Sequence, residues 1–190
     1  MTHEQLCERA RLWLRGTRRC KPVFSRLASC REIPDAIGWS SAYKWHGSTV
    51  IECKTSMSDF HADRRKAVAL RHKLHGYLYR GNAAPRYMRD EDLEPVAIPL
   101  MGDFRFFFCL PDVISAEAVE KYRPDHGLLY LAGRSVRTIR PAPRRTDVDK
   151  DSEIRYLRFA IINRKLAYGE MAEWDIVGPT ECSDGRSVSN

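Results

Sequence analysis

The sequence predicts a single α/β domain with at most one active site. At 190 residues and 43% hydrophobic content, the chain is long enough to bury one sizeable core and short for two. Segments with a helical period alternate with short strand-like runs, and there is no internal repeat or low-complexity segment. We expect the domain to span residues 1–172, with an insertion at about 76–103 and a polar tail over 173–190.

The N-terminal segment has the pattern of an amphipathic helix over residues 3–18. Thr2 and Gln5 have the spacing of a capping box, in which two side chains bind backbone N–H groups at the start of a helix. Apolar residues then recur at helical intervals, namely Leu6, Ala10, Trp13 and Leu14. We expect this apolar stripe to pack against a sheet.

Three strands are expected next, over residues 21–29, 34–45 and 48–56. The segment "HGS" at 46–48 marks the reversal between the last two. Short connections of this kind join neighbouring antiparallel strands, so the three strands should form an antiparallel meander.

A second helix is expected to begin at Ser58, with Asp59 as its cap. About four turns of helix should follow. Its apolar side contains Phe60, Ala67, Leu70 and Leu74, and many basic residues lie between them. Asp63 and Lys66 lie one turn further along. The open face of this helix should therefore be basic.

The second half of the chain predicts a buried strand, a hairpin and a last helix. "FRFFFCLP" at 104–111 is aromatic and continuous enough to be a central strand. Residues 127–141 indicate a hairpin that turns at 132–134, and 152–171 indicate a helix. The apolar side of this helix is expected to contain Ile154, Leu157, Ile161 and Tyr168.

The net charge of +7 and the pI near 9.2 favour an anionic partner. Basic residues concentrate in residues 1–31, 61–90 and 134–145. Such runs are often solvated faces, but arginine outweighs lysine in them, which favours a rim that binds a polyanion. The candidate nucleic-acid-binding residues are Arg64, Arg65, Lys66, Arg137, Arg140, Arg144 and Arg145.

The sequence indicates a cytosolic protein without a membrane anchor. It has no run of 18 apolar residues, and its N-terminal segment lacks the apolar core of a secretory signal. The six cysteines contain no CxxC pair, so reduced thiols are expected. A structural zinc site that joins Cys7, Cys20 or Cys30 to the "HKLH" segment at 72–75 is disfavoured, because none of the spacings matches a known ligand pattern.

Two carboxylates and a lysine are expected to converge on the third strand. Side chains at i and i+2 share one face of a strand, so Glu52 and Lys54 should stand together while Cys53 turns into the core. Asp35 begins the preceding strand, opposite the position of Glu52. Val50 and Ile51 make the strand buried, and a buried Glu and Lys are costly unless they are paired or bind something.

This set of residues suits phosphodiester chemistry. Asp and Glu oxygens hold Mg²⁺, the metal polarises the phosphate and activates a bound water, and a lysine positions that water or neutralises developing charge. The alternative is a structural ion pair between Glu52 and Lys54 beside an unrelated turn residue, Asp35, because so short a pattern often occurs by chance.

Four stretches together resemble the PD-(D/E)XK nuclease superfamily: "PDAIGW", "VIECKTSMSDFHADRRK", "GDFRFFFCLP" and "HGLLYL". Within it, the chain is most similar to small bacterial and phage proteins of the MmcB-like DNA-repair family. The resemblance covers roughly residues 30–140, and the "ECKxSxSDFxADRRK" block is its most specific part. It implies a restriction-endonuclease-like αβββαβ core, in which helices flank a central mixed sheet, with the hairpin and the last helix added.

The resemblance also implies roles for individual residues. Asp35, Glu52 and Lys54 would be catalytic, and metal would be held by Asp35, Glu52 and the main-chain carbonyl of Cys53. Apart from the resemblance, Glu32 lies three residues before Asp35, where it could complete a second metal position or be a surface residue next to Pro34. The chain departs from relatives that carry a Gln-x-x-x-Tyr motif on the following helix, since the nearest analogue is Lys73 to Tyr77. This departure leaves open how the substrate is oriented.

The expected function is that of a Mg²⁺-dependent deoxyribonuclease, with Mn²⁺ as a substitute, acting in repair, restriction or phage biology. The expected compartment is the cytoplasm of a bacterial cell, or that of the host for a phage-encoded protein. The alternative is a catalytically inactive module that binds nucleic acid or a protein partner, because fold does not fix function. A homodimer or another protein partner is left open.

Overall fold

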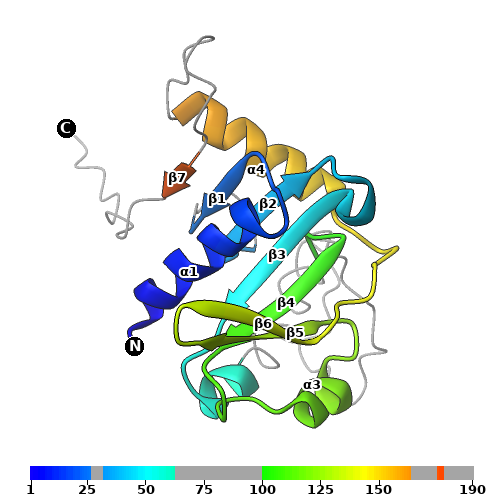
Figure 1. Cartoon of the computed structure of the whole chain (residues 1–190). Coiled ribbons are helices and arrows are strands. Elements are labelled where there is room, and N and C mark those ends of the chain that lie inside the picture. The colour runs from blue at the N-terminus through cyan, green and yellow to red at the C-terminus, as the bar shows by residue number, and fades with distance from the viewer. Residues whose placement is uncertain (27–31, 63–99, 164–174, 178–190) are drawn as a thin grey trace, which may run out of the picture.

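The computed structural model describes residues 1–26, 32–62, 100–163 and 175–177, and in these ranges the chain is a mixed α/β protein (Figure 1). Seven strands form one sheet in the order β6-β5-β4-β3-β2-β1-β7. The strands are β1 Val23–Ser25, β2 Ala36–Ser40, β3 Gly47–Cys53, β4 Phe104–Cys109, β5 Gly127–Ala132, β6 Ser135–Arg140 and β7 Asp175–Val177. The sheet is mixed because β3, β4 and β5 are parallel whereas β1, β2 and β3 are antiparallel.

The first helix, α1 (His3–Gly16), forms as the sequence predicts. The Thr2 hydroxyl accepts a hydrogen bond from the Gln5 backbone N–H, and the Gln5 side chain accepts one from the Thr2 N–H, so the capping box is confirmed. The predicted apolar stripe is buried, and the Trp13 ring packs edge-on against Phe106 of the sheet with a centroid distance of 5.5 Å. The helix covers one face of the sheet.

The antiparallel meander is confirmed, but its strands are shorter than predicted. The described part of the first strand has three residues, and β2 begins at Ala36, directly after Asp35. Residues Tyr43–Trp45, which the sequence assigned to the second strand, form the 3-10 turn η1 instead. This turn precedes Gly47, whose φ of +118° reverses the chain into β3.

The opposite face of the sheet is covered by α4 (Lys150–Asn163), α3 (Ala116–Tyr122) and the start of a helix at Met57, described to Ala62. The predicted apolar side of the last helix is wrong at Ile154, which is 54% exposed. Instead α4 presents Tyr156 and Ala160 to the sheet, beside the partly buried Leu157.

The helix that begins at Met57 is capped differently from the prediction. The Ser56 hydroxyl, not Asp59, accepts the backbone hydrogen bond at the helix start, and its donor is the N–H of Asp59 itself. The short helix α3 was not predicted. It has only seven residues, too few to show a clear helical period in the sequence.

The strand-like run at 104–111 is confirmed as β4, all six residues of which are buried. The hairpin is confirmed as well, with Gly133 in the left-handed conformation between β5 and β6. Residues 76–99 of the expected insertion lie outside the described residues. Its last residues, Met101 and Asp103, are buried against β3 and α4, directly before β4 begins at Phe104.

A buried polar network joins α4 to this part of the sheet. The Asp103 carboxylate accepts hydrogen bonds from the Ser48 backbone and from the Lys150 ammonium, at 2.7 and 2.6 Å. Glu153 accepts hydrogen bonds from the Ser48 hydroxyl and the Trp39 indole N–H, at 2.7 and 3.2 Å. Each carboxylate is therefore satisfied, and α4 is fixed in position over β2 and β3.

Within the expected tail, residues 175–177 form β7, which pairs parallel with β1. The remainder of the tail lies outside the described residues. Among the helices that the structure describes, none is long and apolar enough to cross a membrane.

Candidate functional site

The structure brings Asp35 and Glu52 together as the sequence predicts. Ala36 pairs with Ile51, so Asp35 lies opposite Glu52 at the end of the β2–β3 pair. Asp35 Oδ2 accepts a hydrogen bond from the backbone N–H of Cys53 at 2.8 Å. This bond places the Cys53 peptide directly beside the Asp35 carboxylate, while the Cys53 side chain is buried under α1.

The Glu52 carboxyl group has an unusually high affinity for a proton. Burial, together with the neighbouring carboxylates Asp35 and Glu32, raises its pKa to about 8, although Arg105 and Lys54 act in the opposite direction. Its Oε1 lies 3.3 Å from an Arg105 guanidinium nitrogen. Burial is the main reason that this carboxyl group retains its proton.

Lys54 follows directly after β3 and points to the same face of the sheet as Glu52. Its side chain is only 3% exposed, and its ammonium lies 4.0 Å from Asp59 Oδ1 at the start of the next helix. Asp59 was expected to act as a helix cap, but in the structure it is an ion-pair partner of the candidate catalytic lysine.

Glu32 joins the site through Arg105, a residue that the sequence analysis missed. Glu32 Oε1 lies 2.5 Å from the Arg105 guanidinium, and Oε2 accepts the Met101 backbone N–H at 3.0 Å. Both oxygens of the further candidate ligand thus bind protein groups. A signal for Arg105 exists in the sequence, since it is the one charged residue within the apolar run "FRFFFC".

Arg105 is held from its other side by His126, which the sequence analysis also missed. The Arg105 Nε–H donates to His126 Nε2 at 3.1 Å, and His126 Nδ1 lies 2.9 Å from the Asp125 carboxylate. Burial lowers the pKa of His126 to about 3, so the ring is neutral and its Nε2 accepts. The ring also stacks on Phe107, with a centroid distance of 4.7 Å, which fixes its orientation.

The open atoms of this site fit a hard divalent cation. Asp35 Oδ1 and Glu52 Oε2 accept no hydrogen bond from the part of the chain that the structure describes. Carboxylate and carbonyl oxygens are the ligands that Mg²⁺ and Mn²⁺ prefer. A cation between Asp35 and Glu52 would also favour the ionised form of Glu52 and so oppose the effect of burial on its pKa.

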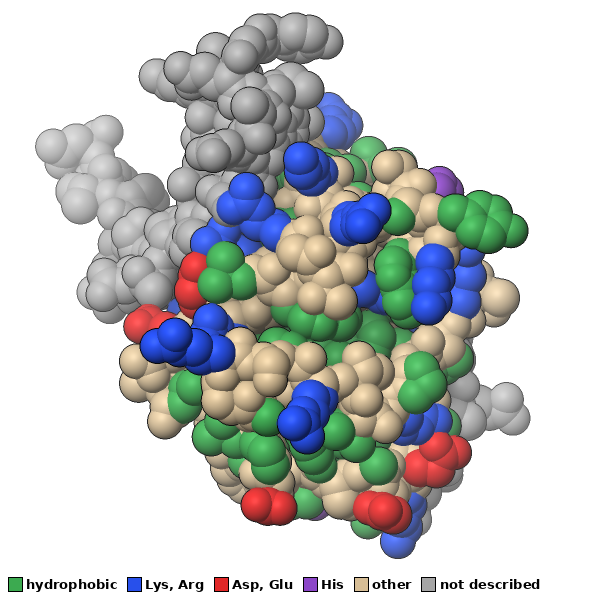
Figure 2. Space-filling view, in the orientation of Figure 1, with side chains coloured by type: hydrophobic (Ala, Val, Ile, Leu, Met, Phe, Trp, Pro, Cys, Tyr) green, Lys and Arg blue, Asp and Glu red, His purple; other side chains and the backbone are tan. Residues whose placement is uncertain are grey.

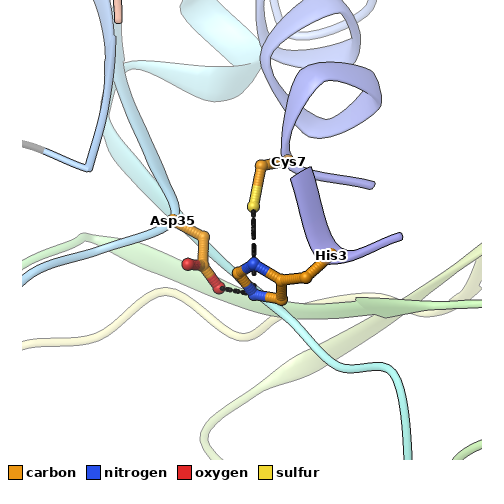
Figure 3. A group of neighbouring side chains, drawn as sticks. All are labelled: His3, Cys7 and Asp35. Atoms are coloured by element: carbon orange, nitrogen blue, oxygen red, sulfur yellow. Dashed lines mark hydrogen bonds and ion pairs between the residues drawn. The ribbon is translucent and has the colours of Figure 1, made fainter. Parts of the chain in front are cut away.

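A second group of side chains meets Asp35 from the α1 side (Figure 3). The His3 Nε2 atom lies 3.3 Å from Asp35 Oδ2, and Cys7 Sγ lies 3.5 Å from His3 Nδ1. The hydrogen bond to Asp35 raises the pKa of His3 to about 9. The Cys7 thiol also contacts the Cys53 thiol, and this hydrogen bond lowers the pKa of Cys7.

Three of the four described arginines of the predicted basic rim lie within ion-pair distance of a carboxylate, and two of these pairs are close. Arg140 pairs with Glu120 at 2.5 Å, and the Arg145 side chain is 6% exposed and pairs with Asp147 at 3.2 Å. Arg144 is 57% exposed and lies 4.0 Å from Asp103, and Arg137 is exposed on the edge strand β6. Figure 2 shows Lys and Arg side chains spread over much of one face, with Asp and Glu mainly near its margins.

The other predicted rim residues, Arg64, Arg65 and Lys66, lie outside the described residues. The same holds for Lys73 and Tyr77, the nearest analogue of the Gln-x-x-x-Tyr motif.

Comparison with known proteins adds a fold relationship. No protein-family model matches the chain, and no curated protein does so either. Among solved structures, the chain is similar to the SPO1766 protein of unknown function from Silicibacter pomeroyi, with a TM-score of 0.51 and 20% sequence identity. The likeness covers 87% of this chain and 88% of that chain. At this identity it shows a shared fold and does not indicate an activity.

The raised pKa of Glu52 predicts a pH-dependent effect of Glu52→Gln on stability. The folded protein holds the Glu52 proton more tightly than the unfolded chain, so Glu52 lowers the unfolding free energy of the metal-free protein as pH rises from about 4.5 to about 8. Glutamine cannot ionise. The melting temperature of Glu52→Gln minus that of the parent should therefore increase over this range. The increase should be about 2–4 °C for each kcal/mol of unfolding free energy that the parent loses when Glu52 ionises.

Thermal melts with a chelator at about pH 5 and pH 8 measure this difference, and the subtraction removes the contributions of His3 and His126, which titrate in both proteins. A difference that stays constant or decreases with pH would show that Glu52 is ionised throughout.

Proposed function

We propose that the chain is a metal-dependent nuclease that hydrolyses phosphodiester bonds in DNA. The observation that carries the proposal is the pair of carboxylates Asp35 and Glu52, which face each other across β2 and β3 and each have one oxygen without a hydrogen bond from the described residues. The buried Lys54 lies on the same face as Glu52. The element order α1-β1-β2-β3, a helix and β4 supports a restriction-endonuclease-like core.

In this proposal, Asp35, Glu52 and the main-chain carbonyl of Cys53 hold Mg²⁺ or Mn²⁺. The bound metal supplies polarisation of the phosphate and a lowered pKa for a bound water. Arg105 orients Glu52 through its contact with Oε1, and Glu32 and His126 in turn orient Arg105. These three are positioning residues, because their recorded contacts are with other protein groups.

Lys54 has a different role. Its ammonium group is kept at the site by burial and by Asp59, and it supplies a fixed positive charge at the position where negative charge develops on the phosphate. A charge that is already in place and shielded from water needs no reorganisation during the reaction, so it acts more strongly than a mobile surface lysine.

One observation favours the second candidate function, an inactive nucleic-acid-binding module on the same fold. Arg105 already places a positive charge 3.3 Å from Glu52 and 2.5 Å from Glu32. An arginine in this position compensates part of the negative charge without a metal. The two functions differ in metal dependence, since the module would bind DNA equally well with a chelator present.

The proposal is tested by incubating the purified chain with labelled single-stranded, duplex, flapped and mismatched DNA in Mg²⁺ or Mn²⁺. We expect cleavage of at least one of these substrates, loss of cleavage with a chelator, and loss of cleavage in Lys54→Ala with DNA binding retained. Binding without cleavage under all these conditions would favour the inactive module.

The exposed arginines predict how DNA binding responds to salt. If Arg137 and Arg144 contact phosphates, the double variant Arg137→Ala/Arg144→Ala should flatten the slope of log affinity against log salt by about one to two units, since each duplex phosphate contact contributes about −0.9. The loss should be the same for all sequences, because backbone contacts carry no sequence information.

Fluorescence anisotropy at several salt concentrations gives this slope. Arg155→Ala on the solvent side of α4 is the matched control, since α4 packs over the other end of the sheet from β6. An equal change in the control variant would mean that the slope reports net charge and not a defined rim.

A further inference from the structure

His3, Cys7 and Asp35 form a compact group of three different ligand types (Figure 3). His3 and Cys7 are four residues apart on α1, so they lie on the same side of the helix. Asp35 precedes β2, and its carboxylate is fixed by the Cys53 backbone N–H. One ligand atom from each of the three residues lies within 4.8 Å of the other two.

One of the three distances between the ligand atoms already matches tetrahedral zinc coordination, and the other two are longer. Zinc bonds of about 2.0 Å to nitrogen and oxygen and about 2.3 Å to sulfur give tetrahedral edges of roughly 3.3 Å for N···O and roughly 3.5 Å for N···S. His3 Nε2 lies 3.3 Å from Asp35 Oδ2 and 3.9 Å from Cys7 Sγ. The distance between Cys7 Sγ and Asp35 Oδ2 is at most 4.8 Å, so the Cys7 side chain would have to move toward His3 and Asp35 when the metal binds.

We propose that His3, Cys7 and Asp35 bind a divalent transition metal of the zinc class. A thiolate and an imidazole select zinc or cobalt over Mg²⁺, which takes oxygen ligands, so this site differs in chemistry from the one between Asp35 and Glu52. A tetrahedral ion would take its fourth ligand from solvent, because the Cys53 thiol is hydrogen-bonded to Cys7 but is not a member of this group. The ligand spacing in the sequence gives no sign of this site, since His3 and Asp35 are brought together only by the fold.

Asp35 belongs to both sites, and this has a regulatory consequence that rests on the proposed function. Its Oδ2 lies beside His3 and accepts the Cys53 N–H, whereas its Oδ1 accepts no hydrogen bond from the described residues and is the oxygen left for the proposed Mg²⁺ site. Two divalent cations on one carboxylate repel each other, so zinc should weaken the binding of Mg²⁺ or Mn²⁺ and thereby inhibit cleavage. By thermodynamic reciprocity, Mn²⁺ should weaken zinc binding by the same factor.

Cobalt titration of the full chain tests the zinc-class site itself. After removal of metals with a chelator, Co²⁺ should give a thiolate-to-cobalt charge-transfer band that saturates at one equivalent and disappears when Zn²⁺ is added. The band should be absent in Cys7→Ala and unchanged in Cys20→Ala, the matched control, because Cys20 is a buried free cysteine in the same core.

His3→Ala provides a second variant that does not disturb the core, because the His3 side chain is 37% exposed. It should weaken Co²⁺ binding by at least about tenfold, since even residues that only orient a metal ligand contribute 10–100-fold. The proposal would be overturned by a parent protein without the band, or by a band that persists in both Cys7→Ala and His3→Ala.

Calorimetry separates this proposal from the proposed function. In the parent, saturating Zn²⁺ should reduce Mn²⁺ affinity at least about fivefold, the lower end of typical coupling between sites, whereas in Cys7→Ala it should have no effect. Zinc binding at His3 and Cys7 without any Mn²⁺ binding would support the zinc-class site and count against the nuclease. Mn²⁺ binding that is insensitive to bound Zn²⁺ would overturn the antagonism.

Discussion

Glu52→Gln is expected to reduce metal-dependent DNA cleavage by more than about 100-fold, while the protein remains folded. Glutamine keeps the shape of the side chain but removes the charge of the proposed metal ligand, and even residues that only orient such ligands contribute 10–100-fold. Initial rates at saturating DNA and Mg²⁺ measure the effect. Glu117→Gln, an exposed residue of α3, is the control for a general loss of negative charge and should cleave like the parent.

A loss of cleavage by Glu52→Gln would be ambiguous if the variant were also less stable than the parent. The structure predicts that it is not less stable. Since ionised Glu52 is costly in the metal-free protein, the variant should melt at the same or a higher temperature. Cleavage by Glu52→Gln at the rate of the parent would contradict the assignment of Glu52 as a ligand.

Arg105→Ala is expected to reduce the unfolding free energy by about 3–5 kcal/mol, the usual cost of removing one partner from a buried ion pair. The guanidinium group is buried, and its removal leaves Glu32 and Glu52 without their shared cation and His126 Nε2 without one donor. Urea denaturation gives the change in free energy. The exposed Arg137→Ala should change it by no more than about 0.5 kcal/mol.

A double-mutant cycle shows where this cost arises. Above about pH 8, where Glu52 is ionised in the parent, Arg105→Ala should cost less in the Glu52→Gln background than in the parent, by about 0.5–3 kcal/mol, because one of the two stranded charges is already absent. An equal cost in both backgrounds would mean that Arg105 acts through Glu32 and the Met101 carbonyl oxygen, and not through Glu52.

Local patterns predicted those parts of the fold that depend on local physics. The capping box at Thr2, the meander and the central strand at 104–109 follow from periodicity and turn residues that are adjacent in sequence. The prediction failed where packing decided the outcome. Ile154 is apolar but exposed, because α4 turns Tyr156 and Glu153 toward the sheet, where Glu153 satisfies Ser48 and Trp39.

In the site, too, features that depend on residues close in sequence were predicted, whereas features that depend on packing were missed. Alternation along a strand was enough to place Glu52 beside Lys54 and opposite Asp35. Arg105, His126 and His3 were missed as members of the site, because each reaches it through residues far away in sequence. A charged residue inside an apolar strand signals that some buried partner exists, but it does not say which one.

Diffraction from a crystal of the full chain soaked in Mn²⁺, recorded at a wavelength where manganese scatters anomalously, tests the proposed metal site. We expect an anomalous peak within coordination distance of the Asp35 and Glu52 carboxylates and of the Cys53 carbonyl oxygen, and no such peak in Glu52→Gln crystals soaked in the same way. A site without a peak at saturating Mn²⁺, with Glu52 still bound to Arg105, would contradict it.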